Sequence, residues 1–238
     1  MNQPTDNHWI SFSDIMTGLM VIFMFIAISY MMEANKKQDE IQQILDSYEN
    51  TKDSIRQDLV MLLHALEEWQ DFIEFDSTNL SIKFIGKDIQ FRSDSDVIQS
   101  KFRQILDDFI PAYLSVIAQD KYKNKIAEVR IEGHANKVEP DSHRSYMLGV
   151  FWAQSRAKNV LKYFINSPDF DDLPKATQGQ LEFWLVANGY GYGRTLDKEG
   201  AYSISSGKEI CEACSRRVEF RIITTSEQVI ADIISQLK

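Results

Sequence analysis

An uncharged apolar segment near the N-terminus constrains this chain more than any other feature. No charged residue occurs from residue 15 to residue 32. At about 1.5 Å of rise per residue, a helix over residues 10–32 is long enough to cross the hydrocarbon core of a bilayer, which is roughly 30 Å thick. The segment lacks the positively charged start and the small-residue cleavage site of a secretory signal peptide. We therefore expect an anchor that spans the membrane once.

A single carboxylate, Asp14, stands at the beginning of this segment. A charged side chain costs roughly 2.5–3.5 kcal/mol at the centre of a membrane helix, and such residues commonly mark ion or proton pathways. Thr17 and Gly18 follow on the same helical face, where a small polar surface suits close packing against a partner helix. The alternative is a hydrated N-cap, with the helix proper beginning at Ile15.

The remainder of the chain, roughly 200 residues, has room for one globular domain and a connector. The formal net charge is −9 and there is no basic stripe, so a nucleic-acid partner is not expected. His134 and His143 lack a third metal ligand, and there is no nucleophile elbow or paired acidic site. The sequence therefore predicts no enzyme, no metal site and no cofactor.

A heptad pattern follows the apolar segment. Apolar residues recur at alternating steps of four and three over more than four heptads, and only Lys52 interrupts them. This pattern is typical of a coiled coil, most simply with a second copy of the same helix, and it predicts a parallel homodimer. The alternative is a long amphipathic helix packed on its own domain. The positions are Ile41, Leu45, Tyr48, Lys52, Ile55, Leu59, Leu62, Leu66, Trp69 and Ile73.

Beyond about residue 76, strand-like and helix-like segments alternate. This order is typical of an α/β sandwich in which helices cover one face of a mixed sheet. A β-hairpin with its turn at 86–88 is predicted first, and Pro111 is predicted to kink or split the helix that follows. The predicted strands are 80–85, 89–91, 127–132, 180–186 and 217–223, and the predicted helices are 97–118, 146–165 and 227–237.

Cys211 and Cys214 form a C-x-x-C pair. One such pair supplies half of a tetrahedral zinc site, and the strand-to-helix setting of a redox motif is not evident. Outside the cytoplasm a local disulfide is favoured. Two free thiols and a zinc site completed by other ligands are the alternatives.

Four segments of the globular region resemble, in order and spacing, the OmpA-like peptidoglycan-binding domains. They correspond to the family's G-H-T-D turn, its R-A helix, its G-Y-G loop and its closing N-R-R-V-E strand. The resemblance extends over about residues 80–223 and implies a peptidoglycan-binding domain outside the cytoplasm. The matching segments are IEGHAN (131–136), QSRAKNV (154–160), NGYGYG (188–193) and SRRVE (215–219).

In that family an aspartate of the turn and the arginine of the helix clamp the zwitterionic centre of diaminopimelate. The arginine corresponds to Arg156, for which an ion pair on the helix surface is the alternative, and the aspartate position holds Asn136. Gly149 and Ala153 stand where the family has asparagine and serine. These departures imply weaker binding or recognition of a different peptidoglycan group. Arg216 of the closing motif is the third implied contact.

Residues 9–20 are similar to the W-x-x-x-x-D-x-M-T-x-x-M segment of flagellar stator B subunits, in which the aspartate carries the translocated ion. The short N-terminal tail without a basic cluster, and the stretch over 13–26, resemble the B subunits of Zorya anti-phage defence systems more closely. The resemblance implies that Asp14, with Thr17, is the ion-translocating site. The implied ion is a proton, with sodium as the alternative.

The resemblance implies a cytoplasmic tail (1–8), a transmembrane helix (9–32), a coiled-coil connector (33–75) and an OmpA-like periplasmic domain (76–238). The implied partners are a second copy, a multi-helix A subunit at five A to two B, and peptidoglycan. The protein would lie in the bacterial inner membrane with its N-terminus in the cytoplasm. Lys36 and Lys37 after the helix favour the opposite orientation, but the domain outweighs them. A flagellar stator subunit and a passive tether from membrane to wall are the alternative functions.

Overall fold

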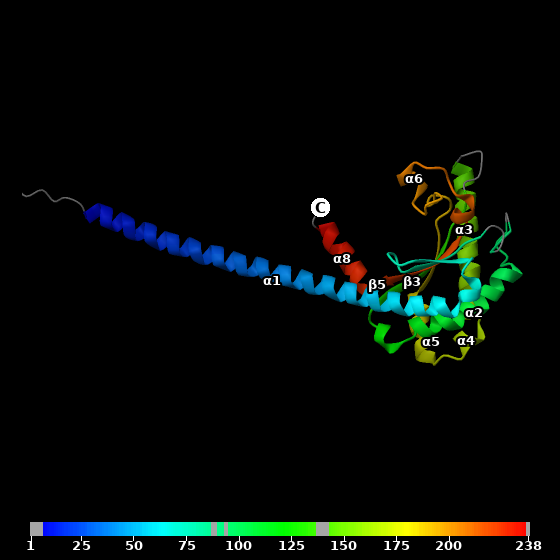
Figure 1. Ribbon diagram of the computed structural model, residues 1–238. Helices are drawn as coiled ribbons and strands as arrows, with labels where there is room; N and C mark the ends of the chain where they lie inside the picture. The colour runs from blue at the N-terminus through cyan, green and yellow to red at the C-terminus, as the bar shows by residue number, and fades with distance from the viewer. Residues whose placement is uncertain (1–6, 87–89, 93–94, 137–142, 237–238) are drawn as a thin grey trace, which may run out of the picture. The chain divides into compact units, whose positions relative to one another are not determined.

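The computed structural model describes residues 7–86, 90–92, 95–136 and 143–236, with side chains from residue 13 to residue 230 (Figure 1). The chain divides into two units, Met1–Ser47 and Tyr48–Lys238.

The first unit contains the N-terminal part of helix α1 (Asn7–Ala65), blue in Figure 1. Within the described residues, α1 is the one helix long and apolar enough to cross a membrane, and its most apolar 18-residue window has a mean hydropathy of 2.2. The side chains of this segment, Ile15 and Phe25 among them, are exposed on every side of the helix. A helix that is apolar all round requires apolar surroundings, which is consistent with the predicted single pass.

The C-terminal end of α1 belongs to the second unit and is buried in its core. Ile55 and Leu59 are fully buried there, whereas Ile41 and Leu45 lie in the first unit and are exposed. The residues in the second half of the heptad pattern therefore pack α1 on its own domain, as the alternative interpretation expects. The second unit begins at Tyr48 rather than at the predicted residue 76, because a heptad stripe has the same spacing whether it faces another chain or its own core. The buried pattern continues through Leu62, Leu66, Trp69 and Ile73.

The second unit contains a five-stranded mixed sheet with the strand order β1-β2-β5-β3-β4. The strands are β1 (Ile73–Asp76), β2 (Ser81–Phe84), β3 (Ile126–Gly133), β4 (Leu185–Gly189) and β5 (Val218–Thr224). β3 and β4 are parallel, and every other neighbouring pair is antiparallel. The carboxyl ends of β3 and β4 therefore lie at the same end of the sheet as the start of β5.

Helices and 3-10 turns that contribute buried residues to the core on one face of this sheet are α2 (Ser100–Ile117), α3 (His143–Ile165), α4 (Pro168–Asp171), α5 (Lys175–Trp184), η1 (Glu67–Trp69) and η2 (Asp120–Tyr122). The remaining helices are α6 (Ser203–Ser206), α7 (Glu212–Ser215) and α8 (Thr225–Gln236). Phe109 of α2 and Phe164 of α3 contact Phe220 of β5, with ring centroids 5.0 and 6.1 Å apart. Successive strand residues face opposite sides, so Glu219 points to the other, charged face. The predicted fold class, an apolar N-terminal helix followed by an α/β sandwich, is confirmed (Figure 1).

The hairpin lies earlier in the chain than predicted. β2 pairs with β1, which precedes it, and with β5. Leu80, with φ 48°, ends the turn between β1 and β2. Of the predicted turn at 86–88 and second strand at 89–91, residues 87–89 lie outside the described residues, and Gln90 and Phe91 are not in a strand. The sequence hid β1 because Ile73 is both the last heptad position and the first residue of that strand.

The predicted strand at 180–186 is instead the end of α5 and the beginning of β4. Leu181 and Trp184 are buried three residues apart, while Phe183 is 77% exposed, which is a helical pattern rather than an alternating one. α2 also continues through Pro111, so the predicted split of this helix does not occur.

The burial of α1 in the second unit predicts that Leu59→Ala lowers the free energy of unfolding by about 2–5 kcal/mol, because the cavity forms in a closed core. Met61→Ala, at a position 62% exposed on the same helix, should change it by less than about 0.5 kcal/mol. Urea unfolding of the detergent-solubilised protein measures both. Equal, small effects would contradict the placement of this end of α1.

Candidate functional site

Asp14 lies inside α1 and not at its start. The helix begins at Asn7, so Asp14 is about two turns from the N-terminus of the helix. The N-cap interpretation is therefore wrong, because a cap residue precedes the first helical turn. The Thr17 hydroxyl donates to the carbonyl oxygen of Ser13 at 2.8 Å. This bond satisfies the hydroxyl proton of Thr17 and leaves its oxygen as an acceptor on the Asp14 face.

A second candidate site lies where β3 and β4 end and β5 begins. The backbone N–H of His134 donates to the carbonyl oxygen of Arg217 at 3.0 Å, and that of Ala135 donates to Gly191 at 2.8 Å. These two bonds hold the turn that carries Asn136 between the loop after β4 and the residues before β5. We call Asn136, the loop 189–193 and Arg216 the sheet-end site.

Helix α3 approaches this end of the sheet very closely. A Cβ atom on Gly133 would lie 2.1 Å from the carbonyl oxygen of Ala153, and one on Gly189 would lie 2.3 Å from the backbone nitrogen of Gln154. Gly149 and Ala153, where the resemblance has asparagine and serine, are buried on this side of α3. Their small size lets the helix lie against the strand ends.

Arg156 is buried, with 5% of its surface exposed. Its guanidinium donates to the carbonyl oxygens of Ser95 and Arg92 at 3.0 and 3.1 Å, and lies 5.3 Å from the ring centroid of Phe91. Arg156 therefore does not lie on the helix surface. Arg156 fastens the segment after β2 to α3 and so forms part of the frame around the sheet-end site.

Asn136 presents an unused acceptor. Its residue is only partly buried, but its Oδ1 atom is inaccessible to solvent and accepts no hydrogen bond from the described residues. Buried acceptors without a donor are rare in native proteins and call for an explanation such as a donor supplied from outside. Arg216, half-buried, is the neighbouring cation of this site.

A buried charge cluster lies beneath the sheet-end site. It consists of Glu132, His134, Arg217 and Glu219, each at most 6% exposed. His134 Nε2 lies 3.6 Å from Glu132 and 3.5 Å from Glu219, and Arg217 Nε donates to Glu219 at 2.5 Å. Sequence reasoning missed this cluster, although the Glu-x-His spacing where β3 ends and the Arg-x-Glu spacing where β5 begins signal side chains on one face.

The cluster contains three ligand atoms within 4.8 Å of one another, from Glu132, His134 and Glu219, which is the geometry of a possible metal site. The donor set does not fit a metal. The Arg217 guanidinium already neutralises Glu219, whose other oxygen accepts from the Ser81 hydroxyl at 2.8 Å. A divalent cation would lie beside a buried guanidinium, so we interpret the cluster as a charge-compensated network.

The cluster shifts the pKa values of two members. Burial lowers the pKa of His134 from 6.5, although the adjacent carboxylates oppose the shift. Burial acts to raise the pKa of Glu219, but the charge of Arg217 and the hydrogen bonds to the carboxylate outweigh it, so its pKa lies below 4.5. His134 is therefore held neutral and Glu219 ionised.

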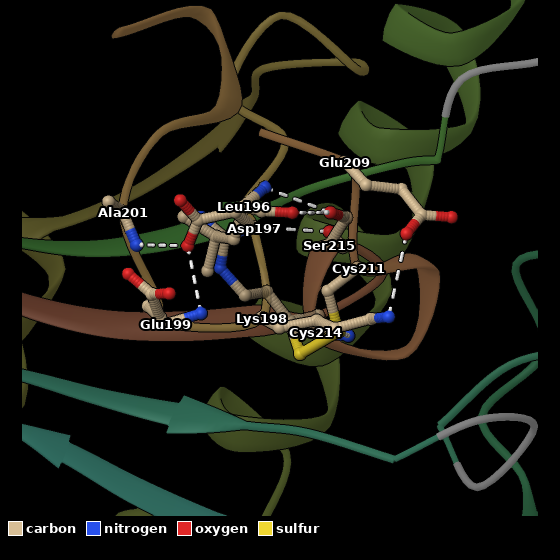
Figure 2. The surroundings of a disulfide bond; sticks show 10 residues. Leu196, Asp197, Lys198, Glu199, Ala201, Glu209, Cys211, Cys214 and Ser215 are labelled. Carbon is tan, nitrogen blue, oxygen red and sulfur yellow. Dashed lines mark hydrogen bonds and ion pairs between the residues drawn. A yellow bond between two sulfur atoms is a disulfide. The ribbon is translucent and has the colours of Figure 1, made fainter. Parts of the chain in front are cut away.

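A disulfide between Cys211 and Cys214 closes the first turn of α7 (Figure 2). The Cys211 N–H donates to the carbonyl oxygen of Leu196 at 2.7 Å, and the Leu196 N–H donates to the Ser215 hydroxyl at 2.9 Å. Figure 2 shows Leu196 and Ser215 close together beside the turn that the disulfide closes. The disulfide thus fixes the turn immediately before Arg216.

Together these features define a class: a protein with an α/β domain and a membrane-length helix that carries a carboxylate. Zorya protein ZorB of Escherichia coli ATCC 8739 is 35% identical over 239 residues, covering 97% of this chain and 94% of that protein. Zorya protein ZorB of Escherichia coli O139:H28 is 24% identical over 218 residues, covering 90% and 79%. The chain belongs to the ZorB family. No family model matches it.

Solved structures with a similar chain trace include a MotB-like protein from Desulfovibrio vulgaris, 16% identical, with a TM-score of 0.46 over 77% of this chain and 98% of that one. The cell wall anchor of the T6SS from Pseudomonas aeruginosa is 18% identical, with a TM-score of 0.43 over 68% and 96%. The periplasmic domain of MotB is 19% identical, with a TM-score of 0.35 over 66% and 70%. At these scores the similarity bears on neither ligand nor partner.

The depressed pKa of His134 predicts a loss of stability on acidification. Below pH 6.5 the unfolded chain binds a proton at His134 that the folded state does not, so stability falls as the pH falls toward the folded pKa. Glu219 acts in the same direction below pH 4.5.

Urea unfolding between pH 7.5 and 5 tests this prediction. His134→Gln should flatten the decline, which for one proton is at most about 1.4 kcal/mol per pH unit. His143→Gln, at an exposed position, should leave it unchanged. The same pH slope in both variants would contradict the assignment, whatever their absolute stabilities.

Proposed function

We propose that this chain is the ion-carrying B subunit of a Zorya anti-phage motor, in the inner membrane with its N-terminus in the cytoplasm. The observation that carries the proposal is Asp14 inside a membrane-length apolar helix, with Thr17 one turn away. Membership of the ZorB family supports it. The proposal includes no catalytic activity.

The chemistry follows from the cost of charge in an apolar medium. A protonated carboxyl is neutral and tolerates such surroundings, whereas the carboxylate requires a polar or cationic partner. Protonation of Asp14 therefore changes which surface of a surrounding A subunit it prefers. The Thr17 oxygen can accept a hydrogen bond from the protonated form. The translocated ion is a proton, with sodium as the alternative.

Two copies of the chain would supply two Asp14 carboxylates to a ring of five A subunits. The exposed residues Ile41 and Leu45 of the first unit continue the heptad pattern outside the core of the second unit. They support pairing of two α1 helices at this level. Because two does not divide five, the two carboxylates cannot meet equivalent surfaces at once, and alternate loading turns the ring in steps.

The second unit would anchor the pair to peptidoglycan through the sheet-end site. The partly exposed Asn136 side chain would accept a hydrogen bond from an N–H group of the wall peptide once its amide rotates outward, and Arg216 would bind a carboxylate. Arg156 would act by holding the segment that frames the site. Compared with the aspartate of the resemblance, Asn136 offers no charge for an ammonium group.

Asp14→Asn should abolish phage protection and ion influx in cells that carry the partner genes, because the amide cannot bind and release a proton. Co-purification with the A subunit should persist. Asp39→Asn, on the same helix outside the apolar segment, is the control and should retain activity. Full protection by Asp14→Asn would contradict the proposal and favour a passive tether.

Arg216→Ala should weaken retention of the detergent-solubilised protein on purified sacculi roughly tenfold, the worth of one charge-assisted hydrogen bond. Lys123→Ala removes an exposed cation at the opposite end of β3 and should have no effect. The anchoring proposal fails if the unaltered protein is not retained or if both variants are retained equally.

A further inference from the structure

Arg194 and His134 face the same atom of the buried charge cluster, Oε2 of Glu132. Arg194 Nη1 lies 3.8 Å from this oxygen, and His134 Nε2 lies 3.6 Å from it. The other oxygen of Glu132 accepts a long hydrogen bond of 3.4 Å from the Tyr190 hydroxyl. Glu132 is only 2% exposed, yet no described residue gives it a hydrogen bond or ion pair shorter than these. It is therefore a buried carboxylate that is weakly bound.

The second carboxylate of the cluster, Glu219, is already occupied. The oxygen that lies 3.5 Å from His134 Nε2 is the one that accepts from Arg217 Nε. Arg217 itself is fixed, because it is buried and its guanidinium also donates to two backbone carbonyl oxygens. A new hydrogen bond from His134 therefore forms most easily at Glu132, where no short bond has to be broken.

Arg194 is the member of this group that can reach water. Its side chain is 38% exposed, whereas those of His134 and Glu132 are each 2% exposed. The Arg194 guanidinium lies 3.6 Å from the centroid of the Tyr190 ring, and that ring is stacked on His134 with centroids 5.4 Å apart. The Tyr190 N–H donates to the carbonyl oxygen of Gly133 at 2.9 Å, which fixes the ring in the loop 189–193. Arg194 can thus leave while its neighbours stay in place.

Protonation of His134 adds a positive charge to side chains whose charges already balance. Burial lowers the pKa of His134 from 6.5, so this protonation requires acidification. An uncompensated charge in a nearly dry space is costly, and the cost is relieved when an exposed cation moves into water. The charged and titratable groups near His134 are Glu132 and Arg130 on β3, Arg217 and Glu219 at the start of β5, and Tyr190 and Arg194 after β4. Arg130 already pairs with Glu128 at 2.7 Å, which leaves Arg194 as the cation to be displaced.

We infer that His134 and Arg194 compete for Glu132, so that protonated His134 binds the Oε2 atom and Arg194 leaves the Tyr190 ring for solvent. Neither ring nitrogen of His134 has a hydrogen-bond partner among the described residues, so the imidazolium has a free donor for this oxygen. A charge-assisted bond would shorten the contact to about 2.8 Å. Because Tyr190 belongs to the loop 189–193, the exchange makes this part of the sheet-end site respond to pH. The inference rests on neither Asp14 nor binding to the cell wall.

NMR spectroscopy of the full-length protein in detergent micelles, with isotope-labelled arginine and histidine, tests the inference. At pH 7.5 the δ-methylene protons of Arg194 should resonate upfield of those of the exposed Arg103, because the ring current of Tyr190 shields them. Between pH 7.5 and 5 this upfield shift should be lost, with the same midpoint as the titration of the His134 imidazole. The resonance of Arg156, which is buried elsewhere in the second unit, should not move, and this distinguishes local release from unfolding.

In His134→Gln the Arg194 resonance should stay upfield at every pH, and in the matched control His143→Gln, at an exposed position, it should titrate as in the unaltered protein. Tyr190→Leu should remove the upfield shift at pH 7.5. The inference is overturned if the Arg194 resonance does not follow the titration of His134, if it moves equally in His134→Gln, or if the shift persists in Tyr190→Leu. The two midpoints in the unaltered protein decide the question even where a variant does not fold. Phage protection and retention on sacculi are not measured, so the proposed function can fail separately.

Discussion

The close contact between α3 and the ends of β3 and β4 is the constraint on which the rest of the second unit depends. Gly133 and Gly189 admit the α3 backbone where any Cβ would collide with it. This contact fixes the helix over the strand ends, from which the sheet-end turn emerges, and it aims Arg156 at the segment after β2. The sheet-end site thus depends on how closely α3 approaches the ends of β3 and β4.

A second constraint, the repulsion between two buried carboxylates, acts on the charged face of the sheet. The register of β3 with β5 sets Glu132 opposite Glu219, and two carboxylates in that position repel each other. Arg217 and His134 separate and compensate them inside a nearly dry space. His134 and Arg217 therefore hold the turn of Asn136 in place and also offset the repulsion between the two carboxylates of this strand pairing.

The sequence predicted those elements whose residue pattern is compatible with only one kind of secondary structure. Alternation over 127–132 and helical spacing over 146–165 both correspond to elements of the structure, β3 and α3. Ile73 fits both the heptad pattern and the first position of strand β1, and because it was assigned to the heptad pattern, β1 was not predicted. The Glu-x-His and Arg-x-Glu spacings put each pair on one face, but the sequence could not bring the two pairs together, because that depends on the register of β3 with β5, which joins residues 87 positions apart, such as Glu132 and Glu219.

The Cys211–Cys214 disulfide joins residues only three positions apart. A cross-link that encloses so short a loop removes little freedom from the unfolded chain, about 2 kcal/mol on the chain-entropy view, against about 4.7 kcal/mol for a loop of 100 residues. Its reduction would therefore leave the sheet and core folded. Reduction would instead release the turn that ties Ser215 to Leu196. The oxidation state of this cysteine pair therefore controls the local order of the residues that precede Arg216, and not the stability of the domain.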